Sequence, residues 1–287
     1  MIAALVRLAR PKQWVKNAFV VAPLFFTPAA LTAANALAVA LAVLAFSLGA
    51  SAIYVLNDYC DRDADRLHPA KRARPIAAGL VPPGAALFYA AVLALAAAAV
   101  AASLPRAFQG ILLLYLALNL AYSLKLKHVS LLDVLIVAMG FVLRVEAGAA
   151  AAGIQATVWI LVCTGLLALF LALAKRRDDL TADLDAAHRK ALDGYTLGFV
   201  DTALAVVLGA LLVSYLIYTT DASLHGRYGT DKLYVTAPFV VAGILRYLQI
   251  ALVEKRAGSP TDIALSDRFI LVCVLGWIAV FGYLIYA

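Results

Sequence analysis

The chain consists of long apolar runs separated by short charged segments. The runs are rich in Ala, Leu and Val, have the length of a bilayer-crossing helix, and lack the alternation of a membrane β-strand. Nine spans are predicted, at residues 15–33, 36–57, 84–103, 107–124, 130–150, 156–175, 197–218, 233–252 and 269–286. Pro23 and Pro28 interrupt the first, which we expect to be bent or partly re-entrant. The expected fold is an all-α membrane bundle of about nine transmembrane helices, forming one domain over residues 1–287.

Composition supports a membrane protein and excludes several other classes. Of the 287 residues, 65% are hydrophobic, and the mean hydropathy of +0.93 is more than a soluble domain requires. The basic, amphipathic stretch 1–14 lacks the apolar core of a cleavable signal and is expected to be an interfacial helix. Cys60, Cys163 and Cys273 are scattered, which excludes a disulfide framework and a zinc pattern.

The placement of lysine and arginine predicts the orientation in the membrane. With nine spans, 19 of the 24 basic residues fall on one side, 3 fall on the other, and the remaining two lie within spans. Basic loops stay in the cytoplasm, so the N-terminus and the charged loops 58–83 and 176–196 are expected there, with the C-terminus outside. The net charge of +7 is explained by this topology and by anionic ligands, and no nucleic-acid partner is expected.

A group of acidic residues follows the second span. If the helix continues, one arc of about 100° holds four oxygen-bearing side chains, those of Asn57, Asp58, Asp61 and Asp65. Asp63 points elsewhere. Carboxylates crowded on one face repel one another unless a cation lies between them, and Mg²⁺ is the cation that suits oxygen ligands and substrate phosphates. The alternative is a solvated acidic turn at a helix end.

A second acidic group follows the sixth span. Its helical face combines cations with carboxylates and consists of Lys175, Arg176, Asp179 and Asp183. Such a face suits a metal and a phosphate together, although a stop-transfer cluster with internal ion pairs would look the same. The candidate phosphate ligands of the whole chain are Lys71, Arg72, Arg74, Lys125, Lys175 and Arg176.

Two charged residues lie inside the fifth predicted span. Arg144 and Glu146 are costly in hydrocarbon and must face a cavity or a partner. At a spacing of two they cannot pair on one helix, so a structural ion pair to another helix is at least as well supported as a ligand role. The sequence contains no dinucleotide-binding, phosphate-loop, zinc-protease or hydrolase nucleophile motif, so the chemistry it indicates is metal plus phosphate.

The two acidic groups resemble the paired Asp-rich motifs of the UbiA superfamily of membrane prenyltransferases. The first reads N57-D-x-x-D61-x-x-x-D65 and the second D179-x-x-x-D183. Several other stretches are similar to one branch, the decaprenyl-phosphate phosphoribosyltransferases: RPKQWVKN at 10–17, YSLKLK at 122–127, LLDVLIVAMGFVLR at 131–144, KRRDDL at 175–180 and SPTDIALSDR at 259–268. The second motif has KRR in front and few acids, which departs from the aromatic prenyltransferases and favours this branch.

The resemblance implies a reaction in a bacterial inner membrane, at its cytoplasmic face. The 5-phosphoribosyl group of phosphoribosyl pyrophosphate would pass to a polyprenyl phosphate, with release of pyrophosphate, to supply arabinose-containing cell-wall polymers. Asp58 and Asp61 would be catalytic, and Mg²⁺ would be held by Asn57, Asp58, Asp61, Asp65, Asp179 and Asp183. An acceptor phosphate is already mostly a dianion, so no protein base is needed. The alternatives are an aromatic-acceptor prenyltransferase that uses a polyprenyl pyrophosphate and a cation-coupled transporter.

Overall fold

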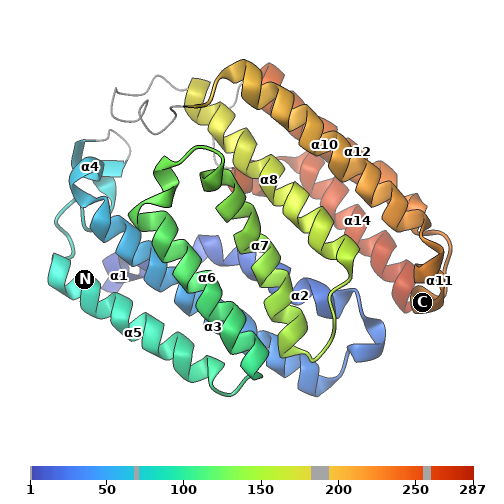
Figure 1. Ribbon diagram of the computed structural model, residues 1–287, viewed down its shortest axis with the longest axis horizontal. Coiled ribbons are helices and arrows are strands. Elements are labelled where there is room, and N and C mark those ends of the chain that lie inside the picture. The colour runs from blue at the N-terminus through green and yellow to red at the C-terminus, as the bar shows by residue number, and fades with distance from the viewer. Residues whose placement is uncertain (1, 68–70, 182–193, 255–259) are drawn as a thin grey trace. The chain divides into compact units, whose positions relative to one another are not determined.

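Figure 1 shows a computed structural model, which describes residues 2–67, 71–181, 194–254 and 260–287. These residues form helices joined by turns and contain no strand. Eight helical segments are long and apolar enough to cross a membrane: Ala33–Cys60 (α3), Pro83–Ala101 (α5), Arg106–Leu124 (α6), Leu132–Ala151 (α7), Val158–Thr181 (α8), Leu197–Thr220 (α10), Leu233–Glu254 and Arg268–Tyr286 (α14). Each matches one of the last eight predicted spans to within six residues, which confirms the all-α multi-pass fold.

The first predicted span, 15–33, is not a helix of spanning length. Its residues are divided among the 3₁₀ helix η1 (Pro11–Asn17), the helix α2 (Ala18–Phe25) and the 3₁₀ turn η2 (Pro28–Ala30). Prolines explain the division, because each lacks an N–H and has a fixed φ: Pro11 and Pro28 open the two 3₁₀ helices and Pro23 lies inside α2. The expected nine spans are therefore eight helices of spanning length and one broken segment in the described part of the chain.

The contacts divide the chain into two compact units, Met1–Ala156 and Thr157–Ala287. The expectation of one domain over the whole chain stays a prediction. In the first unit α3 is the central helix, and it packs against α5, α6, α7 and α2 (Figure 1). In the second unit α8 packs against α10. The segment Leu233–Glu254 combines a 3₁₀ turn, the helix α12 (Ala237–Leu248) and a π-helical turn (Gln249–Glu254). Helix α12 packs against α14.

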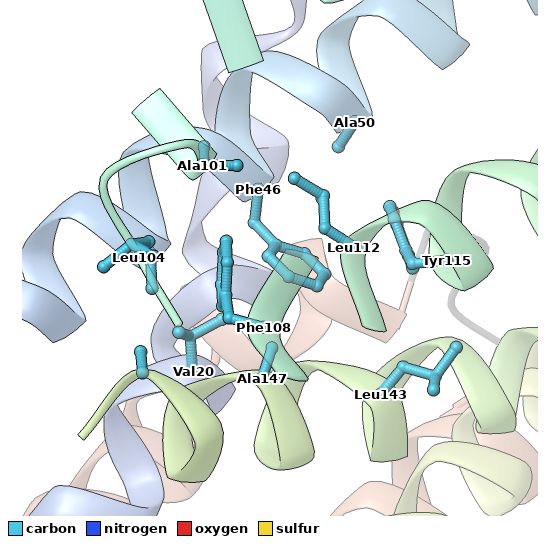
Figure 2. Close-up of a cluster of buried hydrophobic side chains, with 13 residues drawn as sticks. Val20, Phe46, Ala50, Ala101, Leu104, Phe108, Leu112, Tyr115, Leu143 and Ala147 are labelled. Atoms are coloured by element: carbon cyan, nitrogen blue, oxygen red, sulfur yellow. The ribbon is translucent and has the colours of Figure 1, made fainter. Parts of the chain in front are cut away.

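Aromatic and small side chains fill the core of the first unit (Figure 2). Phe46 of α3 lies edge-on to Phe108 of α6, with ring centroids 5.9 Å apart, and is 5.0 Å from the ring of Tyr115. Alanines at the helix crossings, such as Ala50 and Ala147, let the backbones approach closely. This core fixes α3, α6 and α7 against one another and so fixes the polar residues at their ends.

The N-terminal helix α1 (Ile2–Ala9) is amphipathic, as the sequence predicts. Leu8 is fully buried in a cluster with Val55 of α3 and with Ile76, whereas Ile2 is 80% exposed. Helix α1 also contacts the basic loop that follows the short helix α4 (Arg62–Leu67), because the Arg7 Nη2 donates a hydrogen bond to the carbonyl of Ala73 at 3.1 Å. The start of the chain is thereby held beside the end of α3.

Candidate active site

The acidic group of the first unit lies where α3 ends. Helix α3 stops at Cys60, and Asp61 (φ −90°, ψ 0°) separates it from the short helix α4 (Arg62–Leu67). The backbone N–H of Asp61 still donates to the Asn57 carbonyl at 2.9 Å, and that of Asp65 to the Asp61 carbonyl at 2.8 Å. The spacing of a continuous helix is thus kept across the break, as the phasing of the four polar residues assumed.

Two of these carboxylates are almost completely buried and share one arginine. Asp58 is 2% exposed and Asp65 4%. The Arg74 Nη1 lies 3.1 Å from the Asp58 Oδ1 and 2.7 Å from the Asp65 Oδ2. A buried carboxylate without a counter-charge is very costly, and Arg74 supplies a positive charge that both of these side chains share. Of the basic loop residues, Arg74 turns inward to the acids, whereas Arg72 is exposed.

A second arginine, Arg10, contacts the same oxygen of Asp58. Its Nη2 donates to the Asp58 Oδ1, and its guanidinium lies 5.2 Å from the centroid of the Tyr54 ring. Arg10 precedes η1 and was counted in the sequence only as a topology signal. The available signal was the stretch RPKQWVKN, which begins with this arginine. Sequence reasoning therefore missed a cation of the site because its partner is 48 residues away.

Asp61 has a lysine as its partner. The Lys127 Nζ forms an ion pair with the Asp61 Oδ1, and both side chains are partly exposed, at 18% and 30%. Lys127 lies in the 3₁₀ turn η4 (Leu126–His128), directly after α6, whereas Lys125 caps α6 and is exposed. The sequence selected Lys125 from YSLKLK, but the lysine that reaches the acidic group is Lys127. The turn after α6 decides between them.

Asp63 faces away from this group, as the helical phasing predicts. Its side chain is 68% exposed, and it pairs at the surface with Arg66 at 3.1 Å and with Arg62 at 3.6 Å. It is therefore a solvated residue of the same motif and a natural control for the buried ones.

Asn57, the first residue of the group in the sequence, carries an unsatisfied atom. Its Oδ1 is buried and has no hydrogen-bond partner within the described residues. Those residues also contain no set of three or more His, Cys, Asp or Glu side chains gathered as a metal would need. The carboxylates are instead bound to Arg10, Arg74 and Lys127. The oxygen donors fit a hard cation such as Mg²⁺ in their chemistry, provided that these cationic side chains give way.

The acidic group of the second unit is at the end of α8. Arg176 and Asp179 pair on the helix surface at 3.1 Å, three residues apart, and Lys175 is exposed. The neighbouring Arg177 lies 2.7 Å from Asp201 and donates to the Ala251 carbonyl at 2.8 Å. Asp183 lies outside the described residues. An ion pair within the helix, such as Arg176–Asp179, is expected both for a stop-transfer cluster and for a metal and phosphate site without its ligands.

Arg144 is held by neutral groups. Its three nitrogens donate to the Asn17 Oδ1 at 2.9 Å, the Gly140 carbonyl at 2.7 Å and the Tyr115 hydroxyl at 2.8 Å. No carboxylate pairs with it in the parts of the chain that the structure describes. The prediction of an interhelical ion pair for Arg144 is therefore wrong within the described residues. Hydrogen bonds replace it, together with the rings of Tyr115 and Phe141, whose centroids lie 4.8 and 5.2 Å from the guanidinium carbon.

Comparison with known proteins shows the family of the chain. The sequence profile of the UbiA prenyltransferase family matches residues 18–273. The decaprenyl-phosphate phosphoribosyltransferase of Mycolicibacterium smegmatis is 35% identical, covering 100% of this chain and 93% of that protein, and its namesake from Corynebacterium glutamicum is 37% identical, covering 96% and 84%. A UbiA homologue from Archaeoglobus fulgidus, solved with DMAPP and Mg²⁺, superposes with a TM-score of 0.72 at 22% identity over 98% of each chain, a likeness in fold. The chain is a multi-pass membrane protein of the UbiA prenyltransferase family.

Proposed function

We propose that the chain transfers the 5-phosphoribosyl group of phosphoribosyl pyrophosphate to a polyprenyl phosphate and releases pyrophosphate. The observation that carries this is the identity of 35–37%, over nearly the whole length, to two proteins named decaprenyl-phosphate phosphoribosyltransferase. Such a likeness covers both acidic groups and the segments between them. The product would supply arabinose donors for cell-wall polymers.

The charges of the first unit suit two phosphorylated substrates. Arg10, Arg74 and Lys127 converge on three acids, so the site holds cations that can turn to phosphate oxygens once the carboxylates have another partner. Guanidinium groups bind phosphates through two parallel hydrogen bonds and lysine binds them as a point charge. The remaining basic candidates for the phosphates are Lys71, Arg72, Lys125, Lys175 and Arg176.

The oxygen donors suit Mg²⁺. We propose as its ligands Asn57, Asp58, Asp61 and Asp65 in the first unit and, separately, Asp179 and Asp183 in the second. The orphaned Oδ1 of Asn57 supports this, because a buried acceptor without a donor is a site that a cation satisfies. When bound, Mg²⁺ would neutralise the oxygens of the departing pyrophosphate. Asp58 and Asp61 are the residues that we expect turnover to need most.

The acceptor needs no activation by the protein. A phosphate monoester has its second pKa near 6 and is mostly a dianion at neutral pH, so it can attack C1 of the ribose as it stands. The residues of this chain then have to bind both phosphates, hold them near each other and neutralise the leaving group. We place this chemistry at the cytoplasmic face of a bacterial inner membrane, following the excess of basic residues in the loops on that side.

A product assay tests the proposal. Purified protein is offered labelled phosphoribosyl pyrophosphate with a polyprenyl phosphate and, in parallel, labelled prenyl pyrophosphate with an aromatic acid. We expect label from the first donor in the lipid fraction, dependent on Mg²⁺ and abolished by Asp58→Ala but not by Asp63→Ala. Prenylation of the aromatic acid without use of phosphoribosyl pyrophosphate would show that the chain is an aromatic prenyltransferase instead.

A further inference from the structure

Arg10 reaches Asp58 from an unusual backbone conformation. Its φ of 51° and ψ of 58° lie in the left-handed region, which residues other than glycine rarely adopt. The next residue is Pro11, and a residue before proline is normally pushed toward the extended region. Such a conformation persists only where neighbouring contacts enforce it. The question is which contacts do so.

Ser51 of α3 holds the chain on both sides of Arg10. Its Oγ accepts a hydrogen bond from the Trp14 Nε1 at 3.0 Å, and its single proton is shared between the carbonyls of Ala9 at 2.8 Å and Ser47 at 2.7 Å. Ser51 is fully buried, so these bonds do not compete with water. The residue before Arg10 and the indole four residues after it are thereby anchored to a single side chain.

Asn17 extends this anchor from α3 to α7. It is 1% exposed, its Nδ2 donates to the Ser47 Oγ at 2.8 Å, and its Oδ1 accepts from the Arg144 Nε at 2.9 Å. Ser47 lies one helical turn before Ser51 on α3. Asn17 and Ser51 therefore hold the segment around Arg10 against α3 at two points one helical turn apart, and Asn17 also joins it to Arg144 of α7.

A close backbone contact adds to the same docking. A Cβ atom placed on Gly148 of α7 would lie 1.8 Å from the carbonyl oxygen of Val20 in α2. Gly148 and Arg144 are four residues apart and share one face of α7. The segment after Arg10 thus packs closely on α7 at Gly148 and is hydrogen-bonded to it at Arg144. A buried charged residue such as Arg144 is costly in a spanning helix, which indicates a functional role.

We propose that Asn17 and Arg144 are positioning residues for the active site. They touch none of its acids, but they fix η1 between α3 and α7, so that Arg10 keeps its left-handed turn and its guanidinium stays on Asp58. We assign Arg10 to the pyrophosphate of the donor, because it lies on Asp58, a proposed ligand of the Mg²⁺ that would neutralise that group, so the inference rests on the proposed function. Loss of either residue should weaken donor binding and leave the lipid acceptor unaffected.

A double-mutant cycle tests the connection. Arg10→Ala and Asn17→Ala should each raise the KM for phosphoribosyl pyrophosphate at least about fivefold, with the KM for polyprenyl phosphate changed less than twofold. If Asn17 acts through Arg10, the double variant will be no worse than Arg10→Ala alone, within about twofold. Effects that multiply, or an equal rise of both KM values, would overturn the proposal.

The control removes a comparable buried hydrogen bond elsewhere. Thr236 is fully buried, and its Oγ1 lies 2.6 Å from the Tyr215 hydroxyl in the second unit. Thr236→Val should leave the donor KM within twofold, and any loss of rate should multiply with that of Arg10→Ala. A control that behaves like Asn17→Ala would show that general loosening, not positioning, raises the donor KM, and would refute the inference.

A second measurement is independent of turnover. Amide hydrogen exchange over residues 9–17 should accelerate at least tenfold in Asn17→Ala and remain unchanged in Thr236→Val. If the wild type ignores phosphoribosyl pyrophosphate but this acceleration occurs, the proposed function fails and the docking of η1 stands. If exchange is unchanged in Asn17→Ala, the docking fails. Should Arg144→Gln not fold, Trp14→Phe removes only the indole donor to Ser51 and should shift both readouts in the same direction.

Discussion

Arg74 is the residue whose removal should most disturb the first unit. It forms an ion pair with Asp65 and is one of two arginines on Asp58, and both carboxylates are buried. Removing one partner of a buried pair costs about 3–5 kcal/mol, because the other charge stays buried and uncompensated. Arg74 is 26% exposed and Asp58 keeps Arg10, so Arg74→Met should cost about 3 kcal/mol, at the low end of that range.

The assay is thermal unfolding of the purified protein in detergent. For a chain of this size about 3 kcal/mol corresponds to a fall in melting temperature of about 6–12 °C. Arg66→Met is the matched control, because it breaks a surface pair with Asp63 in which both side chains are more than half exposed, and it should change the melting temperature by less than about 2 °C.

A second substitution tests the cause of the loss. If the damage comes from an uncompensated carboxylate at Asp65, then Asp65→Asn in the Arg74→Met background removes that charge and should recover at least half of the lost melting temperature. If Arg74→Met melts within 2 °C of the wild type, or if the second substitution lowers the melting temperature further, the buried acids do not depend on Arg74 and the reasoning is refuted.

Three further predictions concern the site, the topology and the helix packing. Asp58→Ala should retain less than about a tenth of the turnover rate, which is a barrier change of more than about 1.4 kcal/mol, whereas Asp63→Ala should stay near wild type. The measurement is the steady-state rate of variants whose melting temperatures match that of the wild type. An inactive Asp63 variant would contradict the helical phasing. Cys60 is exposed at the end of α3, so a variant with Cys60 as its single cysteine should react with a membrane-impermeant maleimide in inverted vesicles and not in intact cells. Gly148→Ala should force α2 off α7 and lower the melting temperature by about 5 °C or more, whereas Gly209→Ala, where a Cβ meets nothing within 4 Å, should not.

Much of the fold follows from local patterns. The length of each apolar run sets a spanning helix, because in a bilayer the backbone must satisfy its own hydrogen bonds and a helix does so within one segment. The same regularity predicts that Asn57, Asp58, Asp61 and Asp65 share one face and that Asp63 lies off it. These predictions need only the geometry of a single helix, and they hold even though Asp61 interrupts the helix by one residue.

The partners of the charged residues depend on tertiary packing instead. Lys125 and Lys127 are equivalent in the sequence, but the turn after α6 sends only Lys127 to Asp61. In the sequence Arg10 is one of many basic residues that indicate topology, and it reaches Asp58 only because α1 and η1 pack on α3. Direct ion pairs and hydrogen bonds need atoms within a few ångströms of each other, so residues 48 or 66 positions apart become partners only when the helices between them have packed.

Arg144 illustrates the same division within one residue. Its charge inside an apolar run predicts that it faces the interior of the bundle, because hydrocarbon cannot solvate it. Whether an acid, an amide or an aromatic ring would meet it was set by packing on α7: the broken first segment brings Asn17 within reach, and α6 brings Tyr115. The sequence determined that a partner was required, and the packing of α2, α6 and α7 determined which one.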